Sequence, residues 1–248
     1  NDFEEKYLQS SSLQRKYLSF TPSSYKSSQA SSLLLCFHGF GDSAKKFSTT
    51  ADFRSLAEKE NFILIYPQGA LLDGYSHWNA GLESEENKSS TDDFTFIKDL
   101  LTELSKNYNI DTNKIYAAGF SNGAFFSYAL SCFLEGKIAA IASVAGTMLE
   151  ETYLQCPASI KTPMISIHGT NDYVVPYNGS DKGLTAISTV TSFWNIRNEN
   201  NLEATVDSDT ENNIERYSYF NQENKKTVEH FKVIGGGHLW LDINYKGK

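Results

Sequence analysis

The pentapeptide Gly119-Phe120-Ser121-Asn122-Gly123 decides the fold, because it stands between a strand and a helix. The apolar run over 115–118 is typical of a buried parallel strand, and the apolar residues after the pentapeptide recur at helical spacing. A serine between two glycines in this setting predicts a nucleophile elbow. Only glycine fits two positions before and after the serine, and the turn lifts the hydroxyl above the sheet. The bare pattern also arises by chance, so it needs partners elsewhere in the chain.

Further apolar runs follow the same alternation of strands and helices. We predict strands at 15–20, 33–37, 62–66, 138–145, 164–167, 214–220 and 227–234, and helices after 43, after 91 and over 184–194. The pattern predicts one α/β domain over residues 1–248 with a largely parallel central sheet and no separate substrate-binding domain. We expect residues 1–14 to form a flexible tail or a short helix, 15–20 an edge strand and 69–90 a long functional loop.

Composition excludes several classes of protein. The 248 residues carry a net charge of −8 and no basic stripe, so we expect no nucleic-acid partner. No apolar run approaches the length of a membrane span, so we expect no membrane partner either. No metal-ligand spacing is present, and we expect neither a metal nor an organic cofactor.

The three cysteines are too few for a disulfide scaffold. Cys36 lies in an apolar run, which predicts a buried free thiol. Cys132 and Cys156 are able to pair in an oxidising compartment, and the sequence leaves their pairing open. The chain starts at Asn1 without a methionine, so we expect a missing upstream segment and a secreted or periplasmic protein.

A serine nucleophile needs a base, and the base needs an orienting acid. In folds with this elbow the chain order is serine, acid, histidine. His230 lies in the middle of a predicted strand, whereas His238 follows a strand end through three glycines, at the sheet edge where catalytic groups gather. We therefore predict His238 as the base. Three other histidines precede every suitable acid: His38, His77 and His168.

The predicted acid is Asp172, because it follows the strand over 164–167 and reaches the same edge of the sheet. Three other carboxylates are farther from a strand end: Asp181, Asp207 and Asp209. Asp92 and Asp93 are interpreted as charges at a helix N-terminus capped by Thr91, in preference to acid–base groups.

An acyl-transfer transition state also needs donors to its oxyanion, each worth about 2.7–4 kcal/mol. We predict the backbone N–H groups of Asn122 and Phe40 as these donors. His38, just before Phe40, is interpreted as a residue that shapes the loop and not as a second base.

Several motifs occur together in the order of one known family: His38-Gly39, Tyr66-Pro67-Gln68-Gly69, Trp78-Asn79, Asp92-Asp93, Gly119 to Gly123, His168 to Asp172, Val175-Pro176-Tyr177 and Gly235 to Trp240. The chain resembles the polyhydroxybutyrate-depolymerase-like esterases, which grade into feruloyl and acetylxylan esterases of the first carbohydrate-esterase family. The resemblance implies an α/β-hydrolase fold with helices on both faces of the sheet, and a triad of Ser121, Asp172 and His238. It also implies that Trp78, Asn79 and Trp240 lie near the substrate. We expect the aromatic ring of Tyr177 to help cover the acyl group or a sugar face.

The leading hypothesis is a serine carboxylesterase that acts through an acyl-enzyme on feruloyl or acetyl esters of plant polysaccharide, or on related soluble esters. A polyester depolymerase, for example of polyhydroxyalkanoate oligomers, is the main competing hypothesis. Secreted depolymerases that attack solid polymer typically add a linker and a polymer-binding domain. Because this sequence ends at Lys248, we expect soluble or oligomeric esters in preference to solid polymer. A peptidase or acyltransferase, or a catalytically silent binding protein of the same fold, would also fit this set of residues. The oligomeric state is not indicated.

Overall fold

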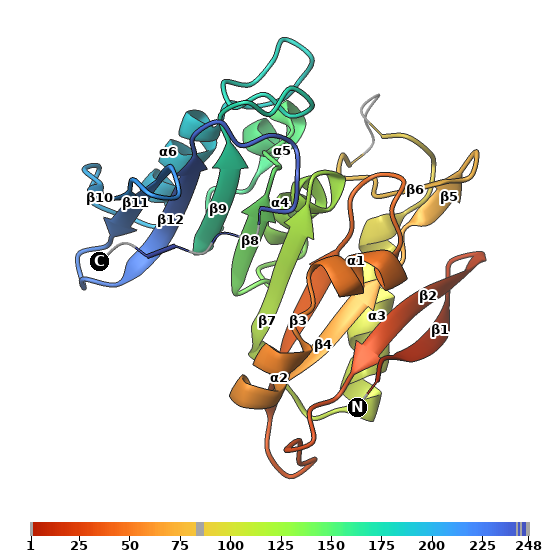
Figure 1. Ribbon diagram of the computed structural model, residues 1–248. Coiled ribbons are helices and arrows are strands. Elements are labelled where there is room, and N and C mark those ends of the chain that lie inside the picture. Colours follow the sequence, from red (N-terminus) through yellow and green to blue (C-terminus); the bar gives the residue numbers. More distant parts are fainter. Residues whose placement is uncertain (1, 83–86, 242, 244, 247–248) are drawn as a thin grey trace.

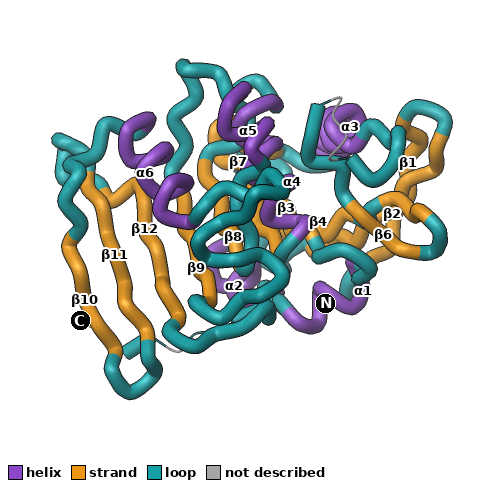
Figure 2. The backbone as a smooth tube through the Cα atoms, turned by 90° about the horizontal axis from the view of Figure 1, so that it is seen from above, coloured by secondary structure: helices purple, strands orange, loops and turns teal. Residues whose placement is uncertain are grey.

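Six parallel strands form the centre of a ten-stranded sheet, and an antiparallel pair extends it at each end (Figures 1 and 2). The computed structural model describes residues 2–82, 87–241, 243, 245 and 246. In spatial order the strands are β1 (Glu4–Ser10), β2 (Leu13–Phe20), β4 (Phe62–Pro67), β3 (Ser31–Phe37), β7 (Ile110–Phe120), β8 (Ala140–Val144), β9 (Met164–Gly169), β12 (Lys226–Val233), β11 (Ile214–Phe220) and β10 (Thr205–Asp209). All six parallel strands therefore end at one edge, as predicted for the site.

Helices cover both faces of this sheet, which confirms the predicted α/β architecture. Two short helices, α1 (Ala44–Thr50) and α2 (Arg54–Glu60), pack on β4 on one face. The other helices lie on the opposite face (Figures 1 and 2): α3 (Asp93–Asn107), α4 (Asn122–Phe133), α5 (Glu150–Gln155) and α6 (Ile187–Arg197). None of the helices in the described part of the chain is long and apolar enough to cross a membrane.

The central strands are buried because their side chains meet helices on both sides. Leu33, Leu35 and Phe37 of β3 are fully buried in the cluster beneath α3 and α4, and Cys36 points to the smaller cluster beneath α1. Cys36 is a free, buried thiol, as predicted.

The two ends of the sheet differ from the prediction. The predicted flexible tail over 1–14 is wrong for its described part, because β1 pairs with β2 from Glu4 to Ser10. The strand over 15–20 is therefore internal, and β1 is the edge. At the other end β10, which the sequence pattern does not indicate, pairs with β11. Both edge strands are short and largely exposed, so neither has the apolar pattern that marks a buried strand.

Three local details also differ. The helix predicted after residue 43 is split into α1 and α2, and Ser43 caps α1 by accepting the Lys46 N–H. The cap of α3 is Asp92, which accepts the Thr95 N–H, and not Thr91. The predicted long loop contains a small hairpin, β5 (Ala70–Leu72) and β6 (Tyr75–His77).

A disulfide joins Cys132, near the end of α4, to Cys156, directly after α5. The structure thus settles the pairing that the sequence leaves open. The bond closes a segment with a sequence separation of 24 residues.

We expect replacement of both cysteines by serine to lower the free energy of unfolding by about 3 kcal/mol, because the cross-link restricts the unfolded chain. Urea unfolding with and without a reductant measures the effect. The reductant should destabilise the native protein by a similar amount and leave the double variant unchanged. Equal stability of the native protein and the double variant without reductant would contradict the expectation.

Candidate active site

Ser121 lies at the apex of a tight turn between β7 and α4. Its backbone is in the left-handed region, with φ 52° and ψ −119°, which is a strained conformation for a residue with a side chain. The turn closes only because its flanking residues are glycines. A Cβ on Gly119 would lie 2.2 Å from the Gly123 carbonyl oxygen, and one on Gly123 would lie 2.2 Å from the Phe37 carbonyl oxygen. The structure therefore has the predicted elbow geometry.

The structure brings together the three residues predicted as the triad. His238 Nε2 lies 2.9 Å from Ser121 Oγ, and His238 Nδ1 lies 2.8 Å from Asp172 Oδ2. The serine and the aspartate are buried, whereas the imidazole is partly exposed. A hydroxyl, an imidazole and a carboxylate in this order can transfer a proton from the serine to the histidine while the carboxylate stabilises the imidazolium.

Two glycines bring the loops of Asp172 and His238 together. A Cβ on Gly169, at the end of β9, would lie 2.1 Å from the Gly236 carbonyl oxygen. That oxygen accepts the Asn171 N–H at 2.9 Å. The loops after β9 and β12 are thus in backbone contact, and this contact sets the separation of the carboxylate from the imidazole.

The Asp172 carboxylate is fixed from both sides. Its Oδ1 accepts the N–H groups of Val174 and Val175 at 2.9 and 2.8 Å. Its Oδ2, which faces His238, also lies 3.5 Å from Nε2 of the buried His168. Burial lowers the pKa of His168, which favours its neutral form, and Nε2 lies 2.8 Å from the Val175 carbonyl. We infer that His168 supports the acid and does not act as a base.

The predicted oxyanion donors lie on two defined backbone segments. Asn122 is the first residue of α4, so its N–H has no acceptor one turn earlier in the helix. Phe40 lies in the loop after β3, which is held to the β5–β6 hairpin by the hydrogen bond from the Gly41 N–H to the Ser76 carbonyl at 2.7 Å. The role of these two N–H groups as oxyanion donors stays a prediction.

His38 shapes this loop, as the sequence suggests. Its Nδ1 lies 2.7 Å from the Gly39 carbonyl, and its Nε2 accepts the Gly69 N–H at 3.0 Å. These contacts define the tautomer with the proton on Nδ1. The residue is fully buried, and burial lowers the pKa of its imidazole.

The side chain of Asn122 has a function that the sequence does not reveal. Its Oδ1 accepts the Trp78 N–H at 2.7 Å and its Nδ2 donates to the Trp78 carbonyl at 2.9 Å. The residue after the serine thus fixes the backbone of the long loop. The indole of Trp78 lies in the core, stacked on Phe126 with ring centroids 5.1 Å apart, and donates to the His38 carbonyl. A substrate contact of Trp78 stays a prediction.

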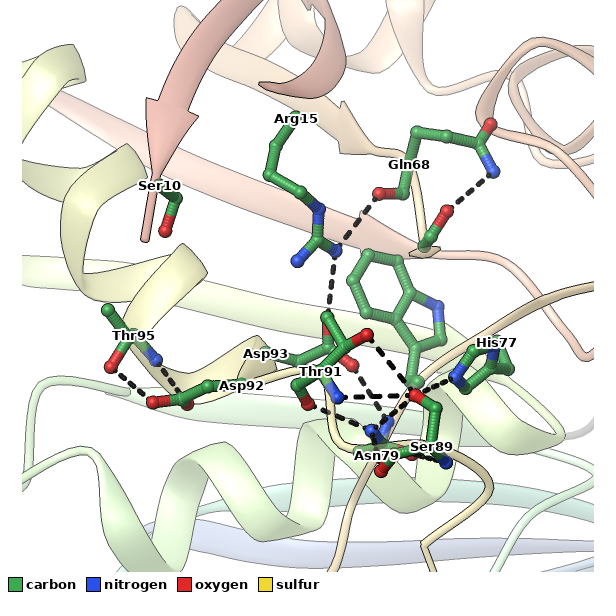
Figure 3. Close-up of polar contacts among 12 residues, drawn as sticks. Ser10, Arg15, Gln68, His77, Asn79, Ser89, Thr91, Asp92, Asp93 and Thr95 are labelled. Atoms are coloured by element: carbon green, nitrogen blue, oxygen red, sulfur yellow. Dashed lines mark hydrogen bonds and ion pairs between the residues drawn. The ribbon is translucent and has the colours of Figure 1, made fainter. Parts of the chain in front are cut away.

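Asn79 organises the same loop, and its contact with a substrate stays a prediction. Its Nδ2 donates to the carbonyls of Ser89 and Thr91, each at 2.8 Å. Its backbone N–H donates to Asp93 Oδ2 at 2.8 Å, and Asp93 Oδ1 accepts from Arg15 Nη2 at 2.7 Å (Figure 3). Both charged side chains are buried. Asp93, which the sequence analysis interprets as a charge at a helix end, therefore joins β2 to the loop between β6 and α3.

The other two residues predicted near the substrate are packed against aromatic neighbours. Tyr177 Oη lies 2.6 Å from Nε2 of His230, which is buried. Trp240 is partly buried against Phe47 and Phe120, with centroids 5.3 and 6.4 Å away. Their contact with a substrate stays a prediction. In the described part of the chain, no group of three or more His, Cys, Asp or Glu side chains is arranged to hold a metal ion.

A serine, an imidazole and a carboxylate hydrogen-bonded at the carboxyl edge of such a sheet are typical of serine hydrolases with the α/β-hydrolase fold. The family described as phospholipase/carboxylesterase matches residues 24–220, and the chain belongs to this family. The solved acetyl xylan esterase from Aspergillus awamori has the same fold, with a TM-score of 0.72 and 14% identity over 96% of this chain and 94% of that one.

Two relatives are named as an acetylxylan esterase/xylanase and as a feruloyl esterase. The chain is 28% identical over 214 residues to a bifunctional acetylxylan esterase/xylanase of Neocallimastix patriciarum, covering 84% of this chain and 29% of the relative. It is 28% identical over 233 residues to feruloyl esterase B of Piromyces equi, covering 90% of this chain and 42% of the relative. The chain thus spans less than half the length of these two relatives. The similarities confirm the expected α/β-hydrolase fold and the expected membership in an esterase family.

We expect Arg15→Met to lower the free energy of unfolding by about 3–5 kcal/mol, because it leaves the buried Asp93 carboxylate without its cation. Urea unfolding measures the loss. Lys161→Gln is the matched control: it removes one cation from the exposed pair with Glu199, which is worth at most about 1 kcal/mol. Similar small losses in both variants would show that the buried pair stabilises the fold no more than the exposed pair does.

The buried His230 should make stability fall in acid. Burial lowers the pKa of its imidazole from 6.5 to about 4. The unfolded chain therefore takes up this proton below pH 6.5, whereas the folded protein does so only near pH 4, and stability is lost between these values. The shift corresponds to about 3 kcal/mol. The free energy of unfolding is measured at about pH 7.5 and about pH 4 for the native protein and for His230→Gln. The loss of stability between the two pH values should be smaller in His230→Gln by this amount. Equal losses in the two proteins would refute the role of His230.

Proposed function

We propose that the protein is a serine carboxylesterase that hydrolyses its substrate through an acyl-enzyme. The observation that carries the proposal is the chain of two hydrogen-bond distances, 2.9 and 2.8 Å, from Ser121 through His238 to Asp172. Membership in the phospholipase/carboxylesterase family supports the same activity. The first step is attack of Ser121 Oγ on the ester carbonyl carbon while His238 Nε2 takes up the hydroxyl proton.

Asp172 stabilises the resulting imidazolium, because its buried Oδ2 faces His238 Nδ1. The negative charge on the former carbonyl oxygen would be met by the N–H groups of Asn122 and Phe40. His238 then gives its proton to the leaving alcohol, and the acyl group stays on Ser121. Water, deprotonated by the same imidazole, attacks the acyl-enzyme and releases the acid.

We propose feruloyl or acetyl esters of plant polysaccharide as the substrate class. The names of the two relatives support this class. Phe40 is 49% exposed and stacks on the exposed Tyr75, with centroids 5.7 Å apart. Such a pair next to a proposed oxyanion donor offers a flat apolar surface for a sugar or an aryl group. Polyhydroxyalkanoate oligomers are the alternative substrate.

Export to an oxidising compartment is part of the proposal. The Cys132–Cys156 disulfide supports it, since such bonds persist mainly outside the cytosol. Alkylation of free thiols in protein from its native host tests the idea. Modification of Cys132 and Cys156 without prior reduction would argue for a reducing compartment.

We expect Ser121→Ala to lower kcat on p-nitrophenyl acetate by at least about 10⁴-fold, because it removes the nucleophile. Ser188→Ala, which changes an exposed serine on α6, is the matched control and should keep full activity. A fluorophosphonate probe should label the native protein and the control but not Ser121→Ala. Ordinary turnover by Ser121→Ala, with its unfolding transition unchanged, would exclude the mechanism.

The natural ester is identified by comparing methyl ferulate, acetylated xylan oligomers and hydroxybutyrate oligomers as substrates. Turnover that depends on Ser121 and prefers the first two supports a polysaccharide esterase. A preference for the third supports the polyester hypothesis. No turnover of any ester, together with no probe labelling, would leave a binding protein with this fold.

A further inference from the structure

A cavity of about 200 Å³ opens at the start of α4, the helix that follows the proposed nucleophile. Its lining includes Asn122 and Phe125, which lie one turn apart at the start of α4, and Leu149 from the loop after β8. Asn122 follows Ser121 directly in the sequence, so the cavity borders the residue next to the proposed nucleophile. The cavity is small compared with most ligand pockets, which suits one substituent of a larger substrate.

Two lysines, Lys88 and Lys182, line this otherwise largely apolar cavity. They come from separate loops, one between β6 and α3 and the other between β9 and α6, which both rise above the carboxyl edge of the sheet (Figure 1). Within residues 2–82, 87–241, 243, 245 and 246, neither ammonium group lies within 4.0 Å of a carboxylate.

The position of Lys88 is defined by its neighbours. Its Nζ lies 5.5 Å from the centroid of the Phe40 ring, at the residue proposed to supply an oxyanion donor. The backbone N–H of Lys88 donates to Asn79 Oδ1 at 3.0 Å, so the network of Arg15 and Asp93 supports this part of the loop. Partial desolvation lowers the pKa of the Lys88 ammonium group, and a bound anion would offset that loss of solvation.

We propose that Lys88 and Lys182 form an anion subsite that favours esters with a carboxylate close to the scissile bond. The inference rests on the proposed esterase activity and specifies its substrate class. Lysines act as mobile point charges, so they attract a carboxylate without fixing its orientation. An acidic substrate would otherwise be repelled by the net negative charge of the protein.

A carboxylate of this kind has two sources within the proposed substrate classes. One is a uronic acid branch next to an acetylated or feruloylated sugar, and the other is the free end of a hydroxyalkanoate oligomer. The subsite recognises what they share, a single negative charge near the ester. One experiment must therefore test whether the negative charge is recognised, and a second must test which substrate carries it.

The first experiment uses pairs of small esters that differ in charge. Mono-p-nitrophenyl glutarate and p-nitrophenyl pentanoate place the difference on the acyl side; 4-acetoxybenzoate and 4-acetoxybenzamide place it on the alcohol side. The readout is the ratio of kcat/KM for the anionic and the neutral ester. Comparing this ratio between variants cancels the intrinsic reactivity of the esters.

We expect Lys88→Gln/Lys182→Gln to lower this ratio by about threefold to tenfold at low ionic strength for at least one pair, since each exposed charge contributes modestly. Hydrolysis of the neutral esters should stay within about twofold. Raising NaCl to about 0.5 M should reduce the ratio of the native protein toward that of the variant. The matched control, Lys26→Gln/Lys137→Gln, removes two exposed lysines outside the cavity and should keep the native ratio.

An unchanged ratio in Lys88→Gln/Lys182→Gln for both pairs would overturn the subsite. An equal loss in the control variant would also overturn it, because the effect would then come from net charge alone. Failure of the native protein to hydrolyse any of the four esters would instead overturn the proposed esterase activity, so the two failures are distinguishable.

The second experiment identifies the source of the carboxylate. Acetylated xylo-oligosaccharides with and without a uronic acid branch form one pair, and a hydroxybutyrate trimer and its methyl ester form the other. A preference for the acid that is lost in Lys88→Gln/Lys182→Gln assigns the subsite to the substrate of that pair. A lysine-dependent preference in neither pair would overturn its role with these natural substrates.

Discussion

The close approach of the backbone at Gly123 to the Phe37 carbonyl is the constraint on which the rest of the site depends. Because no side chain fits between them, α4 can start directly against the end of β3. This contact places Ser121 above the sheet and the first N–H of α4 beside the loop of Phe40. A second glycine contact, between Gly169 and Gly236, joins the loops of the acid and the base. The hydrogen bonds from serine to histidine to aspartate are the result of these two contacts.

The sequence predicts the parts of the fold that carry a strong local pattern. The continuous apolar strands, the elbow and the loops that hold Asp172 and His238 follow from burial and from the shared edge of parallel strands. The edge strands β1 and β10 escape prediction because they are largely exposed and mixed in character. Asp93 carries only the signal of a helix-end charge, because its partner, Arg15, is 78 positions away in the sequence and no local pattern reveals such a pair. The proposed catalytic roles remain predictions.

A network of hydrogen bonds that begins at Arg15 on β2 holds the loop between β6 and α3. Arg15 on β2 holds Asp93, Asp93 holds the Asn79 backbone, and the Asn79 side chain holds the segment that follows. Asn122 fixes the same loop at Trp78, next to the proposed nucleophile. The loop segments 78–82 and 87–92, which these bonds hold, are thus arranged before a substrate arrives, and this lowers the entropy that binding would otherwise cost. Selectivity can then come from the few side chains that these segments present.

The open sheet also has two edges, and both are marked by charge. Glu4, Glu5 and Lys6 lie along β1, and Asp207 lies on β10. An exposed strand is a template on which another chain can add by backbone hydrogen bonds, and charged side chains on it oppose such addition. The charges at the two ends of this sheet therefore oppose the pairing of its edges with a strand of another molecule.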